Sequence, residues 1–355
     1  MPKFFLVTTA LPETWGKRRP ISMLGEWCKF NSQISKIKNR FSVIKKHYCY
    51  SEKKVYQDYK YIDQLYENLL NNLTITLNDY HRVKLSKRYW RIILGPWLAK
   101  FLHLVYDRWN TLEKINYKKD VSKTYVLNIR EDKIIPLDME EFDIFWDTDL
   151  WNHFIYSKIL EEIAPKNIIY KKNFKYKGIK NPLFVKAENK TNIIKKNTKR
   201  YSIYKNNKIF IKNSSIGLKN EILLNLSLFS FPMFSKYKNL RLDLEKNINL
   251  KIRNNLDINF FPKSKFEILI KKLIKIQIPQ IFLESFNEIN NFVDNCPWPN
   301  EPKVIFSSTM LWNSTADIFY VANKIEKKKL NLFMVNMVVF MHNISIALDN
   351  HMKLK

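Results

Sequence analysis

The chain has 355 residues, of which 46% are hydrophobic and 26% charged, so it has the composition of a globular protein and can bury a sizeable core. No run of about 18 uncharged apolar residues occurs, which argues against a membrane-spanning helix. The net charge of +28 comes from 50 lysines and only 11 arginines, beside abundant Asn and Ile and just 5 glycines. A/T-rich codons produce this balance without selection for a polyanion. Because RNA-binding segments usually pair Arg with Gly and aromatic residues, direct nucleic-acid binding is the weaker interpretation.

The cysteines and the N-terminus indicate the compartment. Cys28, Cys49 and Cys296 are scattered and show neither metal-ligand nor disulfide spacing, as is typical of a protein in a reducing environment. The first apolar run ends at Pro12 and is too short for a secretory signal. We therefore expect a cytoplasmic protein, and its lysine excess favours peripheral contact with the anionic inner membrane.

The first part of the chain combines short strands with long helices. Residues 3–10 form a short apolar run that predicts a buried strand, and residues 41–48 predict a second. From residue 52 to about 80, apolar residues recur at three- and four-residue spacing, which predicts an amphipathic helix. Another helix is predicted over 86–112, with a break at Pro96, where the proline begins a new helical turn.

The middle of the chain is strongly basic. Between Pro165 and Lys212 there are fifteen Lys or Arg residues and a single acid, Glu188. We interpret this stretch as a mobile basic insertion or linker, with an ordinary solvated surface as the alternative. Two short pieces within it, 167–170 and 208–212, have strand-like composition.

Order returns towards the C-terminus. A basic amphipathic segment is predicted over 265–278, a helix over 280–293, a strand over 303–308 and a helix over about 314–327. Parallel strands are buried on both faces and need neighbours, so a single βα unit is not a complete domain. The residues after 327 contain no glycine for a phosphate-binding turn. We therefore expect an α/β chain whose second domain is incomplete.

These patterns predict four regions. An N-terminal α/β domain is expected over 1–164 and a lysine-rich insertion or linker over 165–259. A second α/β domain begins over 260–327, and we expect 328–355 to be an out-of-frame tail.

Eight short motifs stand in order along the chain. They are Phe5-Leu-Val-Thr-Thr-Ala10 with Trp15, Leu24-Gly-Glu-Trp-Cys28, Arg88-Tyr-Trp-Arg91, Gly95-Pro-Trp97, Asp107-Arg-Trp109, Pro297-Trp-Pro299, Lys303-Val-Ile-Phe306 and Leu311-Trp312. Their order and spacing resemble those of a family of bacterial transferases associated with lipopolysaccharide and surface-polysaccharide gene clusters. The resemblance covers about residues 1–112 and 260–327 and is much weaker between them.

The resemblance implies a two-domain, glycosyltransferase-like architecture of the Rossmann type. It implies transfer of a sugar or related group to a glycan or lipid-linked acceptor, with the acceptor held by the N-terminal domain. A nucleotide-activated sugar would be the donor, held by the second domain. No bound cofactor and no metal site are expected.

The sequence departs from this family after the last matched helix. The family continues with Gly-Gln-His-Gly-Gly, whereas residues 332–341 here read LFMVNMVVFM. The codons for these residues, read in another frame, permit Tyr-Gly-Gln-His-Gly-Gly-Val. We therefore hypothesise that the reading frame changes after about Lys329, and that the chain is an N-terminal fragment with impaired activity.

Three candidate residues lie in the N-terminal motifs. Thr8 and Thr9 end the first strand, where α/β folds place ligand-contacting loops, and they are candidates for substrate binding. Strand-end capping is the plainer alternative. Glu26, between Gly25 and Trp27, is a candidate general base for a sugar hydroxyl, or else a surface carboxylate.

The helical motifs supply the other candidates. Arg88 and Arg91 lie three residues apart on one helix face and suit a phosphate or carboxylate. The alternative is an ion-paired helix, with Asp107 as a partner. Trp97 is a candidate sugar platform or a core residue, and Asp107 and Arg108 complete the substrate-binding set.

Other functions stay open at this point. The common NTPase, zinc-protease and hydrolase motifs are absent from the sequence. One rival interpretation is a lysine-rich, non-enzymatic protein that binds nucleic acid or an anionic membrane surface. Another is a remnant that folds its N-terminal domain and has no activity.

Overall fold

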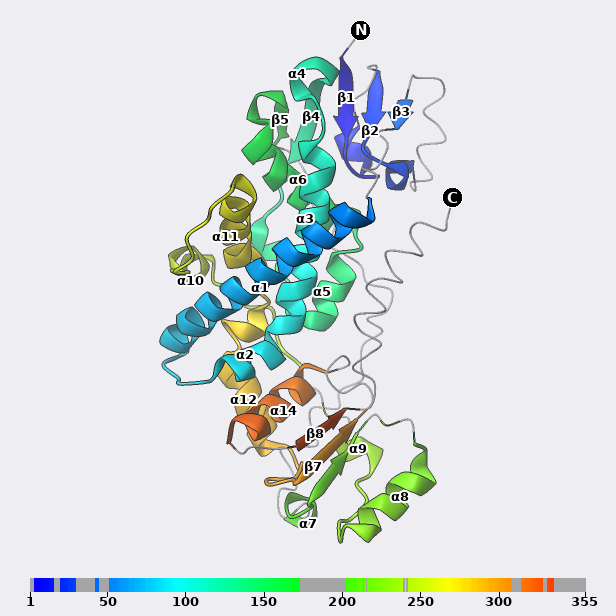
Figure 1. Cartoon of the computed structure of the whole chain (residues 1–355), viewed down its shortest axis with the longest axis vertical. Coiled ribbons are helices and arrows are strands. Elements are labelled where there is room, and N and C mark those ends of the chain that lie inside the picture. The colour runs from blue at the N-terminus through cyan, green and yellow to red at the C-terminus, as the bar shows by residue number, and fades with distance from the viewer. Residues whose placement is uncertain are drawn as a thin grey trace. The chain divides into compact units, whose positions relative to one another are not determined.

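The computed structural model of the chain divides into two compact units (Figure 1). The first comprises Met1–Val185 and Glu245–Phe286, and the second Lys186–Leu244 and Asn287–Lys355. The structure describes residues 3–15, 20–29, 42–44, 51–172, 202–212, 214, 216–238, 240, 242–307, 314–327 and 331–334. Much of the basic stretch between 165 and 212, and most of the tail after 327, lie outside the described residues.

The first unit is built on a parallel five-stranded sheet with the order β3-β2-β1-β4-β5. Its strands are β1 (Phe4–Val7), β2 (Ile21–Met23), β3 (Ser42–Ile44), β4 (Val121–Leu127) and β5 (Ile168–Lys171). The predicted strands at 3–10 and 41–48 are β1 and β3. Neither β2 nor β4 was predicted from the sequence. The strand order reverses direction between β1 and β4, so the chain has the α/β, Rossmann-type fold that was expected.

Helices make up most of the first unit. They are α1 (Glu52–His81), α2 (Lys87–Ile93), α3 (Gly95–Glu113), α4 (Tyr117–Asp120), α5 (Met139–Phe145), α6 (Asp149–Ile163), α10 (Leu250–Asn255) and α11 (Lys265–Gln277). The predicted helix over 52–80 is α1, which begins where the Ser51 hydroxyl accepts a hydrogen bond from the Lys54 amide. It ends at Arg82, whose φ of 55° closes the last turn. The predicted break near Pro96 separates α2 from α3.

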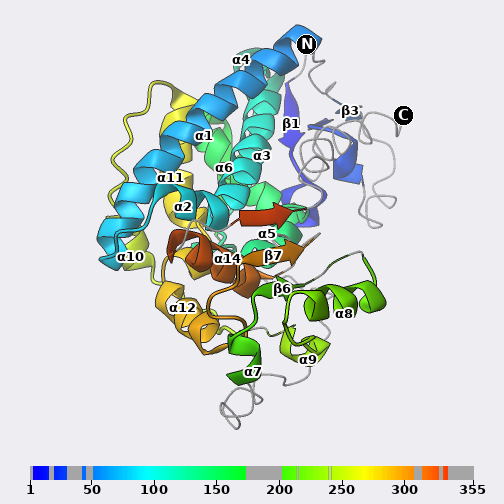
Figure 2. The same ribbon diagram turned by 60° about the horizontal axis from the view of Figure 1, so that its bottom comes forward.

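Close packing between these helices forms the core of the first unit. Helix α3 packs against both α1 and α6, and α6 packs against β4; Figure 2 shows α1 and α3 side by side. At the start of α3, a Cβ on Gly95 would lie only 2.6 Å from the Tyr66 hydroxyl, so a larger residue there would require the Tyr66 side chain to move. Trp97 and Phe101, with ring centroids 5.0 Å apart, are both fully buried.

A later segment of the chain returns to complete the first unit. The predicted amphipathic segment over 265–278 is α11, which packs on α3 and α6. Arg253 of α10 is 1% exposed and donates to both carboxylate oxygens of Glu284, at 2.6 and 2.7 Å. It also donates to the Ile278 carbonyl at 2.7 Å. Because this guanidinium is fully paired, it ties the returning segment together at several points.

The second unit contains a smaller parallel sheet, with the order β6-β7-β8. Its strands are β6 (Ile209–Ile211), β7 (Val304–Ser307) and β8 (Asn331–Met334), and its helices are α7 (Ser202–Lys205), α8 (Leu218–Ser227), α9 (Ser235–Lys238) and α14 (Thr315–Lys327). Helix α12 (Phe286–Asn295) begins at the boundary of the two units. The predicted strand at 303–308 and the helix after it are β7 and α14. The neighbours that β7 requires are β6 and β8, and β8 belongs to the stretch expected to be out of frame.

Candidate active site at the carboxyl edge of the first sheet

The reversal of strand order between β1 and β4 marks the place where open α/β sheets bind ligands. Thr8 and Thr9 follow β1 directly at this edge, and both are buried. Two tryptophans hold their backbone: the indole N–H of Trp27 donates to the Thr8 carbonyl at 3.0 Å, and that of Trp15 to the Thr9 carbonyl at 3.2 Å. These tryptophans belong to the motifs on which the family resemblance rests, and their role here is to position the loop after β1.

A carboxylate meets this loop from α6. The Ala10 amide donates to Asp149 Oδ1 at 2.9 Å, and Asp149 is the first residue of α6, after the N-cap Thr148. Partial burial raises the pKa of Asp149, and the nearby Asp147 raises it further, while the Ala10 amide lowers it. A half-buried carboxylate with a raised pKa at a ligand-binding edge has the properties of a general base.

Two buried polar atoms at the same edge have no hydrogen-bond partner among the described residues. The Leu127 amide, at the end of β4, donates to His153 Nε2 at 3.1 Å, so the neutral ring carries its proton on Nδ1. Burial lowers the pKa of His153 to about 3, which keeps the ring neutral. Neither His153 Nδ1 nor the Thr9 hydroxyl has a partner in this part of the chain.

Thr9 follows β1, and His153 accepts from the last residue of the neighbouring strand β4. β1 pairs with β4 through Leu6 and Thr124, and continuing this register puts Thr9 level with Leu127. Adjacent strands are about 4.8 Å apart. Since a buried group without a partner costs about 1–3 kcal/mol, two of them at one edge suggest a ligand that completes their hydrogen bonds.

A cation lies one turn further along α6. Arg108 of α3 donates to Asn152 Oδ1 at 3.0 Å and pairs with Asp107 at 3.3 Å. Asn152, which Arg108 contacts, follows Asp149 by three residues, or about one helical turn of roughly 5 Å along the axis of α6. Tyr156 lies near them, because Arg108 and Asp107 both influence the pKa of its hydroxyl. The structure thus brings Thr8, Thr9, Asp107 and Arg108 to one region.

Glu26 differs from these candidates in its surroundings. It begins a 3-10 turn after β2, its side chain is 65% exposed, and it pairs with Lys29 at 2.8 Å. An exposed carboxylate paired with a neighbouring lysine lacks the burial that would tune it as a base. Asp149 is therefore the better-placed carboxylate.

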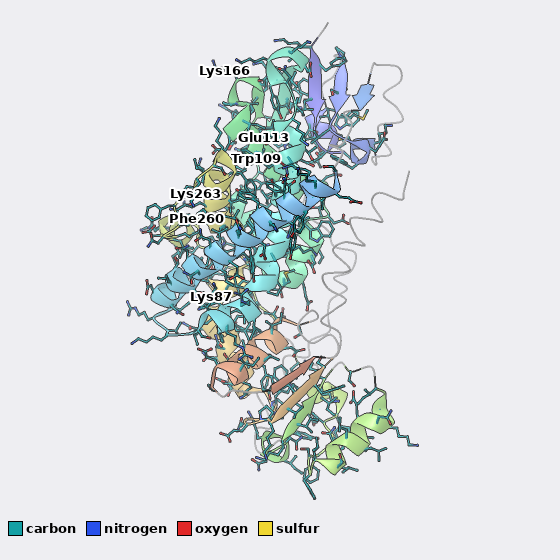
Figure 3. All side chains as sticks on the ribbon, viewed as in Figure 1. Lys87, Trp109, Glu113, Lys166, Phe260 and Lys263 are labelled. Carbon is teal, nitrogen blue, oxygen red and sulfur yellow. The ribbon has the colours of Figure 1, made fainter. Side chains whose placement is uncertain are left out.

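The remaining candidates lie away from the edge. Arg91 forms a two-pronged ion pair with Glu67 of α1, which holds the pKa of that carboxyl at about 2, and Lys87 joins the pair at 3.0 Å. Arg88 is exposed. In Figure 3, Lys87 marks this end of the unit, well separated from Trp109 and Glu113 near the end of α3.

Trp97 is a core residue in its geometry. Its side chain is 0% exposed and stacks on Phe101, with Phe142 edge-on at 6.4 Å. It precedes Asp107 by ten residues on α3, or about 15 Å along the helix. A sugar cannot reach the face of a ring that is covered on both sides by the core.

The second sheet carries a buried ion pair at its own carboxyl edge. Lys212, the residue after β6, pairs with Asp317 in the first turn of α14, and the two side chains are 2% and 0% exposed. The Lys212 ammonium lies 4.7 Å from the centre of the ring of Trp298, the tryptophan of the Pro297-Trp-Pro299 motif. The buried ammonium therefore has both an anion and an aromatic face that offset the cost of burying its charge.

Neither unit shows a metal site in the described ranges: no group of three or more His, Cys, Asp or Glu residues has suitable geometry. Within the same residues, no helix combines the length and the apolar character needed to cross a bilayer.

Comparison with known proteins decides the family. The sequence model of a protein family, the LIC12162 family transferase, matches residues 4–336, which is most of the chain. The chain belongs to the LIC12162 transferase family. No curated protein and no solved structure matches it.

In this member of the LIC12162 family, sequence analysis missed Asp149 and His153. The available signal was the sequence Thr148-Asp149 ahead of an apolar run, which is typical of a helix N-terminus. That signal predicts the start of a helix, but it does not predict which loop of the chain lies against the first turn of that helix. Ala10, which donates to Asp149, lies 139 residues earlier.

Proposed function

We propose that this transferase moves a glycosyl group from a nucleotide-activated sugar to a hydroxyl of a glycan or lipid-linked acceptor in bacterial surface-polysaccharide or lipopolysaccharide biosynthesis. The family assignment supports transfer as the reaction class, and the position of Asp149 is the observation that carries the mechanism. The three scattered cysteines favour the cytoplasm as the site of this reaction.

In the proposed reaction, the acceptor hydroxyl lies against Asp149. Its oxygen attacks the anomeric carbon of the donor, and the bond from that carbon to the diphosphate oxygen breaks. The hydroxyl proton passes to Asp149, and the bonding electrons leave with the nucleoside diphosphate. Because the Ala10 amide holds Oδ1, the other carboxylate oxygen is the one that receives the proton.

The neighbours of Asp149 are assigned to acceptor binding. The Thr9 hydroxyl and the His153 Nδ1–H supply an acceptor and a donor for sugar hydroxyls, since neither has a hydrogen-bond partner among the described residues. Arg108 supplies a partly buried cation for an anionic group on the acceptor. The resemblance assigns the donor to the second unit.

The test is transfer by the purified full chain. Nucleoside diphosphate release would be measured with a panel of nucleotide sugars and surface-glycan acceptors, and the product identified by mass. Asp149→Asn should lower kcat about 100- to 10,000-fold, the usual contribution of a general base. Asp147→Asn, which removes an exposed carboxylate two residues away, is the matched control and should change kcat little.

The pH profile gives a second, independent readout. Since the base must be ionised and its pKa is raised, kcat/KM should fall with decreasing pH along a limb centred above the ordinary carboxyl value of 3.8. That limb should disappear in Asp149→Asn. Retention of full activity by Asp149→Asn, with an unchanged profile, would contradict the assignment.

A further inference from the structure

Helix α8 of the second unit has its apolar side facing outwards. Leu218, Ile222, Leu223 and Leu226 are 73%, 36%, 55% and 57% exposed. At 100° per residue these four positions fall within an arc of about 140°, so they form one continuous apolar face. A surface helix normally turns such a face towards the core.

The polar side of α8 is the side that packs inwards. Glu221 accepts from the Ser214 hydroxyl at 2.6 Å and pairs with Lys238 of α9 at 2.5 Å. Asn225, only 4% exposed, donates to the Glu221 carbonyl, and its own carbonyl accepts from the Ser230 amide at 2.9 Å. Figures 1 and 2 both show α8 beside α9 on the outside of their unit. Specific bonds therefore hold the helix with its apolar face outwards.

The segment after α8 continues this face. Phe229, Phe231 and Phe234 are 97%, 55% and 67% exposed. Phe229 also has a φ of 50°, in the left-handed region, which a bulky side chain rarely adopts. Met233, between these phenylalanines, is buried and anchors the segment. A strained, almost fully exposed phenylalanine makes sense where the ring has a partner outside the chain.

Charge identifies that partner. Residues 202–244 hold seven Lys or Arg and only two acids, and the whole chain carries +28. Two copies of so positive a chain repel each other, which disfavours self-association through this face. A bilayer with anionic headgroups attracts the same charge and accepts Leu, Ile and Phe side chains at its acyl boundary.

We propose that the apolar face of α8 and the phenylalanines of the following segment, up to Phe234, form a docking surface for an anionic lipid bilayer. The surface lies outside the proposed catalytic edge and does not depend on the transferase mechanism. It would hold the second unit at a membrane, where lipid-linked substrates are found.

The test is flotation of the full chain with vesicles of phosphatidylcholine containing about 30% phosphatidylglycerol, a charge density that attracts basic segments. The protein should float with these vesicles and bind pure phosphatidylcholine more weakly. Added salt should reduce the difference between the two. The double variant Leu226→Ser/Phe229→Ser should lower the partition coefficient at least about tenfold, since each buried apolar side chain supplies a large part of such binding.

Phe261→Ser is the matched control. Phe261 is 81% exposed but belongs to the first unit, so its loss should leave flotation unchanged. Phe229→Gly separates docking from folding: it relieves the left-handed backbone, so the variant should unfold at a higher urea concentration while it binds vesicles less.

Three results would overturn the proposal. They are absence of flotation with anionic vesicles, equal flotation of Leu226→Ser/Phe229→Ser and the unaltered chain, and equal loss in Phe261→Ser. Sedimentation velocity tests whether a second copy of the chain, instead of lipid, covers this face. A dimer that the double variant abolishes would assign the face to a second copy and would also overturn docking to lipid.

Discussion

The two parallel sheets end in different kinds of polar edge. At the carboxyl edge of the first sheet, the Thr9 hydroxyl and His153 Nδ1 are buried without partners among the described residues, beside the half-buried Asp149. At the corresponding edge of the second sheet, Lys212 and Asp317 are fully buried and bonded to each other. Buried uncharged groups without partners suit the binding of a ligand, whereas at the second edge two buried opposite charges already hold each other.

Breaking the ion pair should have the largest effect. Lys212→Met leaves Asp317 as a buried charge, and we expect it to destabilise the second unit by about 3–5 kcal/mol. Hydrogen exchange of peptides from β6 and α14 would measure this locally, because protection there should fall while that of β1 and β4 is kept.

Two controls sharpen this result. Lys212→Met/Asp317→Leu removes both charges and should recover much of the loss, because no uncompensated charge remains. Arg91→Met breaks an exposed pair with Glu67, whose side chains are 43% and 42% exposed, and should change stability by less than about 1 kcal/mol. If Lys212→Met matched Arg91→Met, the second edge would not depend on its ion pair.

Acid should weaken the first unit through His153. Its pKa is about 3 in the folded chain against an ordinary 6.5, so between these values the unfolded chain binds more protons than the folded chain. This contribution is therefore fully present above pH 6.5 and is lost as the pH falls towards 3, by about 2–3 kcal/mol at pH 4.5. Urea unfolding of the full chain at pH 7.5 and 4.5 would measure it.

His153→Gln tests the assignment, because glutamine can still accept from the Leu127 amide but does not titrate in this range. In this variant, the difference in unfolding free energy between pH 7.5 and pH 4.5 should be smaller by about 2–3 kcal/mol than in the unaltered chain. His103, whose pKa burial also lowers, provides the matched comparison in His103→Gln. An unchanged difference in His153→Gln would mean that this ring does not report on acid unfolding.

The unpartnered hydroxyl of Thr9 should have the smallest effect on stability. Thr9→Val replaces a buried hydroxyl by a methyl of similar shape, so the free energy of unfolding should stay equal or rise by about 1 kcal/mol. If the hydroxyl binds the acceptor, KM for the acceptor should rise in the same variant. A clear loss of stability would instead indicate that Thr9 is already bonded in the folded chain.

Local sequence predicted much of the fold because the signals were local. Apolar periodicity and the proline at residue 96 are read within one or two turns, and α1, α2 and α3 follow them. The buried run 3–10 and the strand before α14 were equally clear. By contrast, β2 has only three residues, Ile21–Met23, and becomes a strand through pairing with β1 and β3.

The candidate site was predictable only in part. The end of the first strand pointed to Thr8 and Thr9, because the position of a strand end in a parallel sheet is a general rule. The sequence could not show that Asp149 meets Ala10, or that Arg91 is occupied by Glu67 across two helices. Burial, and with it the pKa of each group, depends on residues far away in the chain.

By itself, the sequence determined the alternation of strands and helices, the basic character and the motifs that place the chain among transferases. Tertiary structure decided which carboxylate lies at the sheet edge, which polar atoms remain without partners and which face of α8 points outwards. The physical reason is that hydrophobic periodicity acts over a few residues, whereas desolvation and hydrogen-bond satisfaction depend on neighbours that only folding supplies.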